Sequence, residues 1–293
     1  MIFSQLVINA IIAGSFYALV AIGFSLIYKT ARFFHFAHGS VYTVAAYLCY
    51  LCFSLWHLPL LIAFAAAIVG CIVLGVLCEL LIYRPLRGRG AGSLELAIAS
   101  LGIFIILQNT LSLLFGEETK TLFSVEVKEG MMLFGAKITS TQIAIIASAL
   151  FVLFCGFILL KHTRIGIQLR AVANDPTLAV ISGIDRNTVV MMSFALGSGL
   201  VAIPSLLLFT EIDVTPTIGL NIFMMSVVVM IIGGIDSIPG VYLGAMFLSF
   251  VQTFGTYFSS SKWQEAIAFC LLLLFLLFRP QGFLGRKAGK ITL

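Results

Sequence analysis

Two histidines three residues apart are the side chains in this sequence best suited to chemistry, because imidazole nitrogens bind transition metals and transfer protons. His35 and His38 belong to a His-Phe-Ala-His-Gly run that ends at Gly39. No third ligand stands close to them, so the pair does not predict a metal site. The favoured interpretation is a re-entrant turn or helix start at the membrane edge, with His38 and Gly39 facing a cavity, where irregular backbone is tolerated.

Other residue patterns that support catalysis are missing from the sequence. Cys49 and Cys52 form a CxxC pair, but thiols in an apolar segment pack as small hydrophobic groups. No phosphate-binding Gly-x-x-x-x-Gly-Lys-Ser/Thr run occurs, and no Ser/His/Asp set or carboxylate pair indicates an enzyme. Ion-coupled carriers bury ionisable groups at mid-membrane, whereas the carboxylates here fall near segment ends: Glu79, Glu95, Asp236 and Glu265. The sequence therefore predicts no catalytic residue and no cofactor bound by this chain.

Sparse uncharged polar residues within the apolar segments are the remaining candidates for lining a path through the membrane. Most of them are expected to form interhelical hydrogen bonds, worth about 0.6 kcal/mol each. The chosen path candidates, with the two residues of the histidine run, are Ser15, His38, Gly39, Gln108, Asn109 and Gly234. Gly234 belongs to the run 233–240, which is either a tight loop or a broken-helix element of a gate.

Composition determines the class of protein that carries these residues. Of 293 residues, 61% are hydrophobic and 10% are charged, and the mean hydropathy is +1.14. These values are typical of polytopic membrane proteins. The net charge of +5 reflects the distribution of charge between loops and does not indicate nucleic-acid binding. We expect an all-α polytopic membrane protein with one transmembrane domain, 1–293.

A helix that crosses a bilayer needs about 20 apolar residues, and nine stretches approach that length. The predicted spans are 5–28, 40–56, 59–82, 94–115, 140–160, 187–209, 221–235, 240–258 and 263–278. The span 40–56 is short, and 221–258 is either two spans or a broken pair with a re-entrant piece. The prediction is a bundle of about eight or nine transmembrane helices with a short cytoplasmic coupling helix.

Lysine and arginine in the short loops predict the orientation, because they are enriched on the cytoplasmic side. Alternating the nine spans places thirteen of the seventeen positive charges on one side. The inner set is Lys29, Arg32, Arg84, Arg87, Arg89, Lys161, Arg164, Arg170, Arg186, Arg279, Arg286, Lys287 and Lys290, and the outer set is Lys120, Lys128, Lys137 and Lys262. The N-terminus is therefore expected outside and the C-terminus inside. The loop 116–139 is then external, either a small hairpin or cap or an ordinary solvated loop, and the loop 161–186 is cytoplasmic.

The stretch 169–186 predicts a short helix within that cytoplasmic loop. Asp175 is a good N-cap for the free amides of a first turn, Pro176 suits the first helical position, and Gly183 can adopt the left-handed conformation that ends a helix. The apolar positions of this helix, of roughly two turns, are Leu178, Val180 and Ile181. A helix that short cannot cross a bilayer, and its apolar side chains predict a docking site for a cytoplasmic protein.

Motifs spread in order over nearly the whole chain point to a family. They are Gly14–Leu19, Gly23–Tyr28, Phe34–Gly39, Leu169–Pro176, Ser182–Ile184, Phe194–Ser198, Ser237–Gly240 and Phe278–Phe283, with Ala179, Gly233, Gly234 and Gly244. Together they resemble the LivH-type permeases of branched-chain amino acid ABC importers. One position departs from the family pattern, since His35 stands where the family has asparagine.

This resemblance implies partners and a role for the short helix. Such permeases pair with a second, related permease chain and with two ATP-binding subunits, which hold the ATP and Mg²⁺, in the bacterial inner membrane. A periplasmic binding protein delivers the substrate, which is typically leucine, isoleucine or valine and in relatives another neutral amino acid, urea or a short amide. The residues expected to couple the permease to its ATPases are Arg170, Ala171, Asp175, Pro176, Ala179 and Gly183.

Two alternatives remain open at this stage. A stand-alone secondary carrier or channel for a small neutral solute, such as urea or an amide, needs no docking partner. An intramembrane enzyme would use His35 and His38. Uptake by the chain alone would favour the first alternative, and a metal bound to the purified protein would favour the second.

Overall fold

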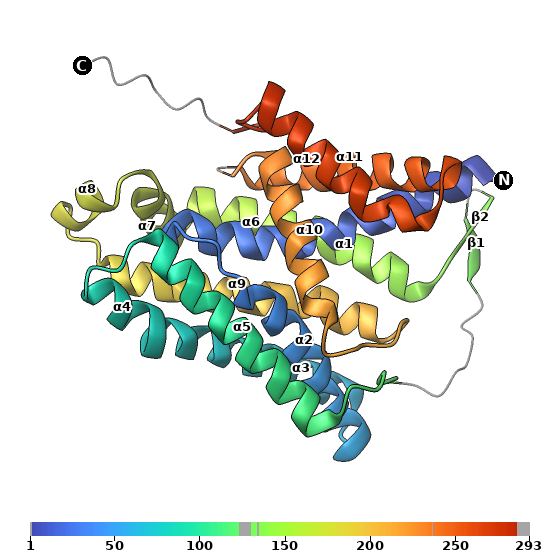
Figure 1. Ribbon diagram of the computed structural model, residues 1–293, viewed down its shortest axis with the longest axis horizontal. Coiled ribbons are helices and arrows are strands. Elements are labelled where there is room, and N and C mark those ends of the chain that lie inside the picture. The colour runs from blue at the N-terminus through green and yellow to red at the C-terminus, as the bar shows by residue number, and fades with distance from the viewer. Residues whose placement is uncertain (1, 123–129, 134, 236, 286–293) are drawn as a thin grey trace.

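The computed structural model describes residues 2–122, 130–133, 135–235 and 237–285, which are mainly helical (Figure 1). Its helices are α1 (Ile2–Ala31), α2 (Ala37–Tyr50), α3 (Leu60–Cys78), α4 (Arg84–Gly88), α5 (Ser93–Phe115), α6 (Ser140–His162), α7 (Arg164–Asn174), α8 (Pro176–Ile181), α9 (Arg186–Phe209), α10 (Ile218–Gly233), α11 (Ile238–Phe258) and α12 (Gln264–Phe278). Short π-helical stretches, Leu51–Leu55 and Glu79–Tyr83, follow α2 and α3, and a 3₁₀ turn, Ser261–Trp263, precedes α12. Two strands, β1 (Met131–Leu133) and β2 (Ala136–Ile138), pair antiparallel.

Every one of the nine predicted spans is helical, so the prediction of an all-α polytopic membrane protein is confirmed. In the described part of the chain, seven helical stretches are long and apolar enough to cross a membrane. The other two predicted spans are the short helices α2 and α10. The region 221–258 therefore contains two separate helices, of which only α11 is long enough to cross.

The bundle has two distinct ends (Figure 1). One end, which we name the α8 end, carries α4, α7 and α8. The opposite, hairpin end carries the N-terminus and the β1–β2 hairpin, where the backbone N–H of Lys137 donates to Gln5 Oε1 at 2.8 Å. The hairpin lies within the predicted outer loop 116–139, whereas the predicted positions Lys128, Asp236, Arg286, Lys287 and Lys290 lie outside the described residues.

Helix α1 lies at the centre of the core and packs against α6, α9, α10 and α11. Its small residues Ala10, Gly14 and Ala18 recur every four positions and are buried. Small side chains at this spacing allow helix backbones to approach closely, which is how helices gain van der Waals contact where lipid supplies no hydrophobic drive.

Helices α2 and α10 both begin inside the bundle. His38 Nε2 lies 3.4 Å from the carbonyl oxygen of Val20, about 16 Å along α1 from its end at Ala31, given a rise of ~1.5 Å per residue. Gly39 meets Gly219 of α10 so closely that a Cβ atom at Gly39 would lie 2.2 Å from the Gly219 carbonyl oxygen. The expected helix start at His38 is therefore present, but its expected place at the membrane edge is wrong. A helix can begin there because each backbone packs against another helix and not against lipid.

Replacing Gly39 with alanine is expected to lower the thermal stability of the protein markedly. The added methyl group collides with backbone atoms, which cannot move aside as a flexible side chain can, and overpacking of this kind costs about 1–3 kcal/mol. Melting of the detergent-solubilised protein, followed by size-exclusion chromatography, measures the effect. Gly102→Ala is the matched control, because a Cβ there meets nothing within 4 Å. Equal melting temperatures for the two variants would contradict the role assigned to this contact.

Candidate docking and translocation site

The short helix α8 forms as its sequence predicts. The Asp175 carboxylate accepts hydrogen bonds from the backbone N–H groups of Thr177 and Leu178, at 2.8 and 3.0 Å. Pro176 occupies the first turn, and Gly183 ends the turn with φ at +82°. These contacts stabilise a helix of only six residues. An isolated helix of this length would be marginally stable, because it forms too few hydrogen bonds to offset the cost of nucleation.

Helix α8 presents its apolar side chains to the outside. The exposed fractions of Leu178, Val180 and Ile181 are 61%, 54% and 77%. Ala179, by contrast, is 3% exposed and packs with Leu169, Val172 and residues of α1 and α9. One side of the helix is thus anchored to the bundle, and the other side offers contiguous apolar surface of the kind that marks protein-binding sites.

A second helix, α7, precedes α8, and the sequence analysis did not identify it. Thr163 caps α7 by accepting from the backbone N–H of Gly166 at 3.0 Å. Of the predicted coupling residues, Arg170 is exposed on α7 and Ala171 packs partly against the buried cluster beneath α8. The predicted coupling element is therefore two helices joined at Asp175.

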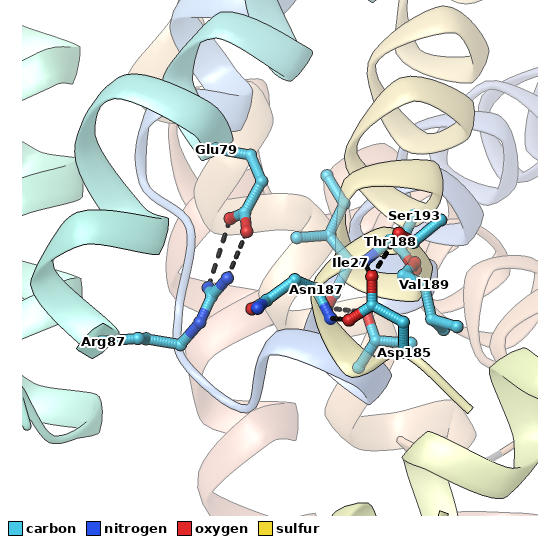
Figure 2. Close-up of polar contacts among 9 residues, drawn as sticks. Ile27, Glu79, Arg87, Asp185, Asn187, Thr188, Val189 and Ser193 are labelled. Atoms are coloured by element: carbon cyan, nitrogen blue, oxygen red, sulfur yellow. Dashed lines mark hydrogen bonds and ion pairs between the residues drawn. The ribbon is translucent and has the colours of Figure 1, made fainter. Parts of the chain in front are cut away.

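A hydrogen bond near the α7–α8 junction and the capped turn that follows α8 attach this pair to the spanning helices α1 and α9. Arg32, just beyond α1, donates a hydrogen bond to the Ala173 carbonyl. Asp185 caps α9 by accepting from the backbone N–H groups of Asn187 and Thr188, at 3.0 and 3.3 Å (Figure 2). The side chain of Thr188 and these amides lower the pKa of Asp185, so this cap stays charged at neutral pH. Movement of α7 and α8 would therefore pull directly on α1 and α9.

A buried ion pair lies beside the α9 cap, as Figure 2 shows. Arg87 of α4 binds both carboxylate oxygens of Glu79, with Nη1 to Oε2 at 3.1 Å. The Glu79 side chain is 1% exposed and that of Arg87 is 10% exposed. A two-point contact of this kind satisfies both groups and fixes their geometry.

Arg87 of this ion pair forms part of the wall of a cleft at the α8 end. This cleft, of about 480 Å³, is lined by Arg84, Arg87, Gly88, Val180, Ile184, Asp185, Arg186 and Asn187. It thus joins the exposed side of α8 to three arginines from α4 and α9. The surface here is apolar on α8 and positively charged next to it.

The predicted path residues do not form one group. Ser15 of α1 is fully buried, as are His38 and Gly39 at the start of α2. Asn109 of α5 points outward and bonds the Ile105 carbonyl of its own helix at 2.8 Å, and Gln108 beside it is half-buried. Gly234 lies at the α8 end, where it packs against Gln281 and Gly285. The role of all six in transport stays a prediction.

The two histidines are packed among aromatic rings. His35 Nδ1 lies 3.0 Å from the Tyr83 hydroxyl, and the ring centroids of His35 and His38 are 6.2 Å apart. Phe194 contacts His35, and Phe24 contacts His38. In the part of the chain that the structure describes, no three His, Cys, Asp or Glu side chains gather in a group that could hold a metal ion.

Several polar contacts in the structure were not predicted from the sequence, because the residues that form them lie near the ends of the predicted spans. Glu79 lies in an apolar stretch two turns before Arg87, a spacing that could have indicated an ion pair along one helix face. Glu265 accepts a hydrogen bond from Asn221, and Gln264 donates one to Tyr17 at 3.2 Å. These two contacts join residues distant in the sequence, and no local pattern indicates them.

Comparison with known proteins agrees with this architecture. The profile of the family "Branched-chain amino acid transport system / permease component" matches residues 6–276. The chain is 33% identical to the high-affinity branched-chain amino acid transport system permease protein BraD of Pseudomonas aeruginosa, covering 96% of this chain and 95% of BraD. It is 31% identical to LivH of Escherichia coli, covering 97% of this chain and 96% of LivH. A probable permease LivH of Methanocaldococcus jannaschii is 28% identical, with 97% and 93% covered.

One solved structure has a similar fold. PsaBC from Streptococcus pneumoniae, in complex with a Fab, aligns with a TM-score of 0.54 over 95% of this chain and 92% of that chain, at 13% identity. The resemblance inferred from the motifs is thus confirmed over nearly the full length. The chain is a multi-pass membrane protein that belongs to the permease component family of branched-chain amino acid transport systems.

Proposed function

We propose that this chain is the permease subunit of an ATP-binding-cassette importer for branched-chain or other small neutral amino acids. A second permease chain completes the pathway in the membrane.

 Two ATP-binding subunits carry ATP and Mg²⁺ and dock on α7 and α8, and a periplasmic binding protein delivers the substrate. This proposal rests on the family and on the names of the relatives, which are branched-chain amino acid permeases.

The observation that best supports the docking role is the exposed side of α8. Leu178 and Ile181 are more than half exposed on a helix that is capped at both ends and anchored through Ala179. A rigid, anchored helix with an exposed apolar side suits insertion into a groove of another protein. The neighbouring cleft, with Arg84, Arg87 and Arg186, would receive acidic side chains from the same partner.

The distribution of charge supports a cytoplasmic α8 end, because basic residues concentrate on that side of membrane proteins. The described basic residues toward the α8 end are Lys29, Arg32, Arg84, Arg87, Arg89, Lys161, Arg164, Arg170, Arg186 and Arg279. Those toward the hairpin end are Lys120, Lys137 and Lys262. We infer an external N-terminus and a cytoplasmic C-terminus.

The attachments of α7 and α8 suggest how ATP would drive transport. When the ATPases close on ATP, they would shift α7 and α8 as one rigid element. Arg32 and the Asp185 cap would pass this movement to α1 and α9. Tilting of these helices would switch the bundle between outward-open and inward-open states, a packed-helix movement of the hinge and shear type.

Uptake by the reconstituted complex tests the proposed function. The chain is placed in proteoliposomes with its partner permease, ATPases and binding protein, and uptake of radiolabelled leucine is measured. We expect uptake that requires both ATP and the binding protein. Gradient-driven uptake by this chain alone would instead support a stand-alone carrier or channel.

Labelling of single cysteines tests the orientation. The background lacks the two exposed native cysteines, Cys155 and Cys270. A membrane-impermeant maleimide should label Ser182→Cys only from the cytoplasmic side and Met132→Cys, on the hairpin, only from outside. The reverse pattern would overturn the proposed docking of the ATPases on α8.

A further inference from the structure

A polar cleft opens between α1, α10 and α12, away from the docking helices. Its volume is about 410 Å³, and it is lined by Tyr17, Asn221, Met225, Ser261, Lys262, Gln264 and Glu265. This volume is within the range of small-molecule sites, roughly 300–1,000 Å³. Most of the lining side chains are polar, in a chain that is 61% hydrophobic.

The cleft lies toward the hairpin end of the bundle, where the short turn Ser261–Trp263 joins α11 to α12. Tyr17 is about 20 Å along α1 from Ala31, and Gln264 is about 20 Å along α12 from Phe278, at ~1.5 Å per residue. Both Ala31 and Phe278 end their helices at the α8 end. The cleft is therefore about 20 Å from the α8 end, on the side of the bundle that faces the hairpin end, and its Lys262, Gln264 and Glu265 side chains are exposed.

Hydrogen bonds between four helices hold the cleft together. Gln264 of α12 donates to the Tyr17 hydroxyl of α1 at 3.2 Å, and Asn221 of α10 donates to Glu265. Behind these residues, Gln252 of α11 donates to the Gln264 carbonyl at 2.9 Å. Figure 1 shows α10 crossing the bundle at a steep angle to α1, and the Asn221 hydrogen bond ties its first turn to Glu265 of α12.

Several polar groups at the cleft are left without a full set of partners. Gln252 is 3% exposed, yet its Oε1 accepts no hydrogen bond. Among the described residues, no carboxylate lies within ion-pair distance of Lys262, and no basic group lies within that distance of Glu265. A positive and a negative charge thus stand three residues apart on one wall, and neither has an ion-pair partner in the described part of the chain. Two exposed charges of opposite sign beside one polar cleft favour a ligand that carries both signs.

We propose that this cleft is a recognition site for the zwitterionic backbone of an α-amino acid. Glu265 binds the α-ammonium group, while Lys262 and the Tyr17 hydroxyl donate to the α-carboxylate. The site rests on the proposed function, since it assigns the step at which the permease receives the substrate. Met225, which is 3% exposed, is the apolar lining residue. We therefore expect the cleft to bind the charged groups shared by all α-amino acids and to make little contact with the amino acid's side chain.

Uptake by the full complex in proteoliposomes, with saturating binding protein, tests the assignment. Glu265→Gln and Lys262→Met should each lower the leucine imported per ATP hydrolysed by about tenfold or more, since hydrogen bonds to charged groups are worth that factor. The matched controls are Glu118→Gln and Lys120→Met, which remove the same two charges from a loop at the hairpin end, outside the cleft. These controls should stay within about twofold of the unsubstituted complex.

Binding of leucine to the purified complex, measured without the periplasmic binding protein, tests which chemical groups of the substrate the cleft recognises. Glycine should displace radiolabelled leucine, whereas 3-methylbutylamine and 4-methylpentanoate, which each lack one charge, should not. Displacement by the amine or the acid, but not by glycine, would overturn the proposal.

The outcomes separate this inference from the proposed function. Leucine uptake that is unchanged in both cleft variants would overturn the inference and leave the importer function intact. Loss of the second permease chain from either variant complex would also overturn it, because the two charges would then belong to a subunit interface. Absence of amino-acid uptake by the unsubstituted complex would overturn the proposed function itself, and the cleft assignment with it.

Discussion

Replacing Leu178 or Ile181 with glutamate is expected to lower ATP-driven uptake by about 100-fold while leaving the permease folded. Both side chains are exposed, at 61% and 77%, so a carboxylate at either position remains hydrated in the free permease. In the docked complex the same carboxylate would be buried in an apolar groove without a partner. Losses at the centre of an interface reach 2 kcal/mol or more per residue, and about 2.7 kcal/mol corresponds to 100-fold.

Co-purification of the ATPases with the permease and uptake in proteoliposomes measure this effect. The matched control is Met132→Glu, which places the same charge on an apolar residue that is 64% exposed on the hairpin, at the opposite end of the bundle. We expect the control to retain its ATPases. Normal co-purification and uptake in the Leu178 and Ile181 variants would show that the ATPases bind elsewhere.

Replacing Glu79 with glutamine is expected to be the most destabilising of the single substitutions considered. It leaves the buried guanidinium of Arg87 without its carboxylate, and Arg186 lies close enough to add to the repulsion. Breaking a buried ion pair from one side costs about 3–5 kcal/mol. The melting temperature of the solubilised protein should therefore fall by about 5–10 °C or more.

The double variant Glu79→Met with Arg87→Met separates two contributions to stability. One is the cost of leaving a buried charge unpaired, and the other is the net stabilisation that the intact ion pair provides. Because desolvation offsets much of the attraction in a buried pair, replacing both partners by apolar residues is often nearly neutral. We expect most of the lost stability to return. Glu118→Gln, at a side chain that is 91% exposed, should change the melting temperature little. A double variant as unstable as Glu79→Gln would contradict this explanation.

The cap of α8 was predictable from the sequence because its determinants are local. Asp175, Pro176 and Gly183 lie within nine residues of one another, and each acts on the backbone of its own turn. The seven stretches long enough to cross a membrane were predictable for a similar reason, since membrane thickness sets a length and composition that the chain displays directly. The motifs of the family belong to the same level, and the comparisons confirmed them.

The depth at which helices begin was not predictable from local sequence. The length of the apolar stretch after His38 gives no sign that α2 starts about a third of the way back along α1 from Ala31. That position depends on Gly39 meeting Gly219, 180 residues later in the sequence. Contacts between distant glycines follow from how whole helices cross.

The sequence by itself determined the class of the protein, its long apolar spans, its family and the short helix α8, because each depends on composition or on residues close together in the chain. Only the tertiary structure decided that Glu79 and Arg87 are a buried pair, and that Tyr17, Asn221, Lys262 and Glu265 line one cleft. Whether a charge is buried, paired or free depends on which helices pack beside it. A single helix face does not hold that information, because its partners come from elsewhere in the chain.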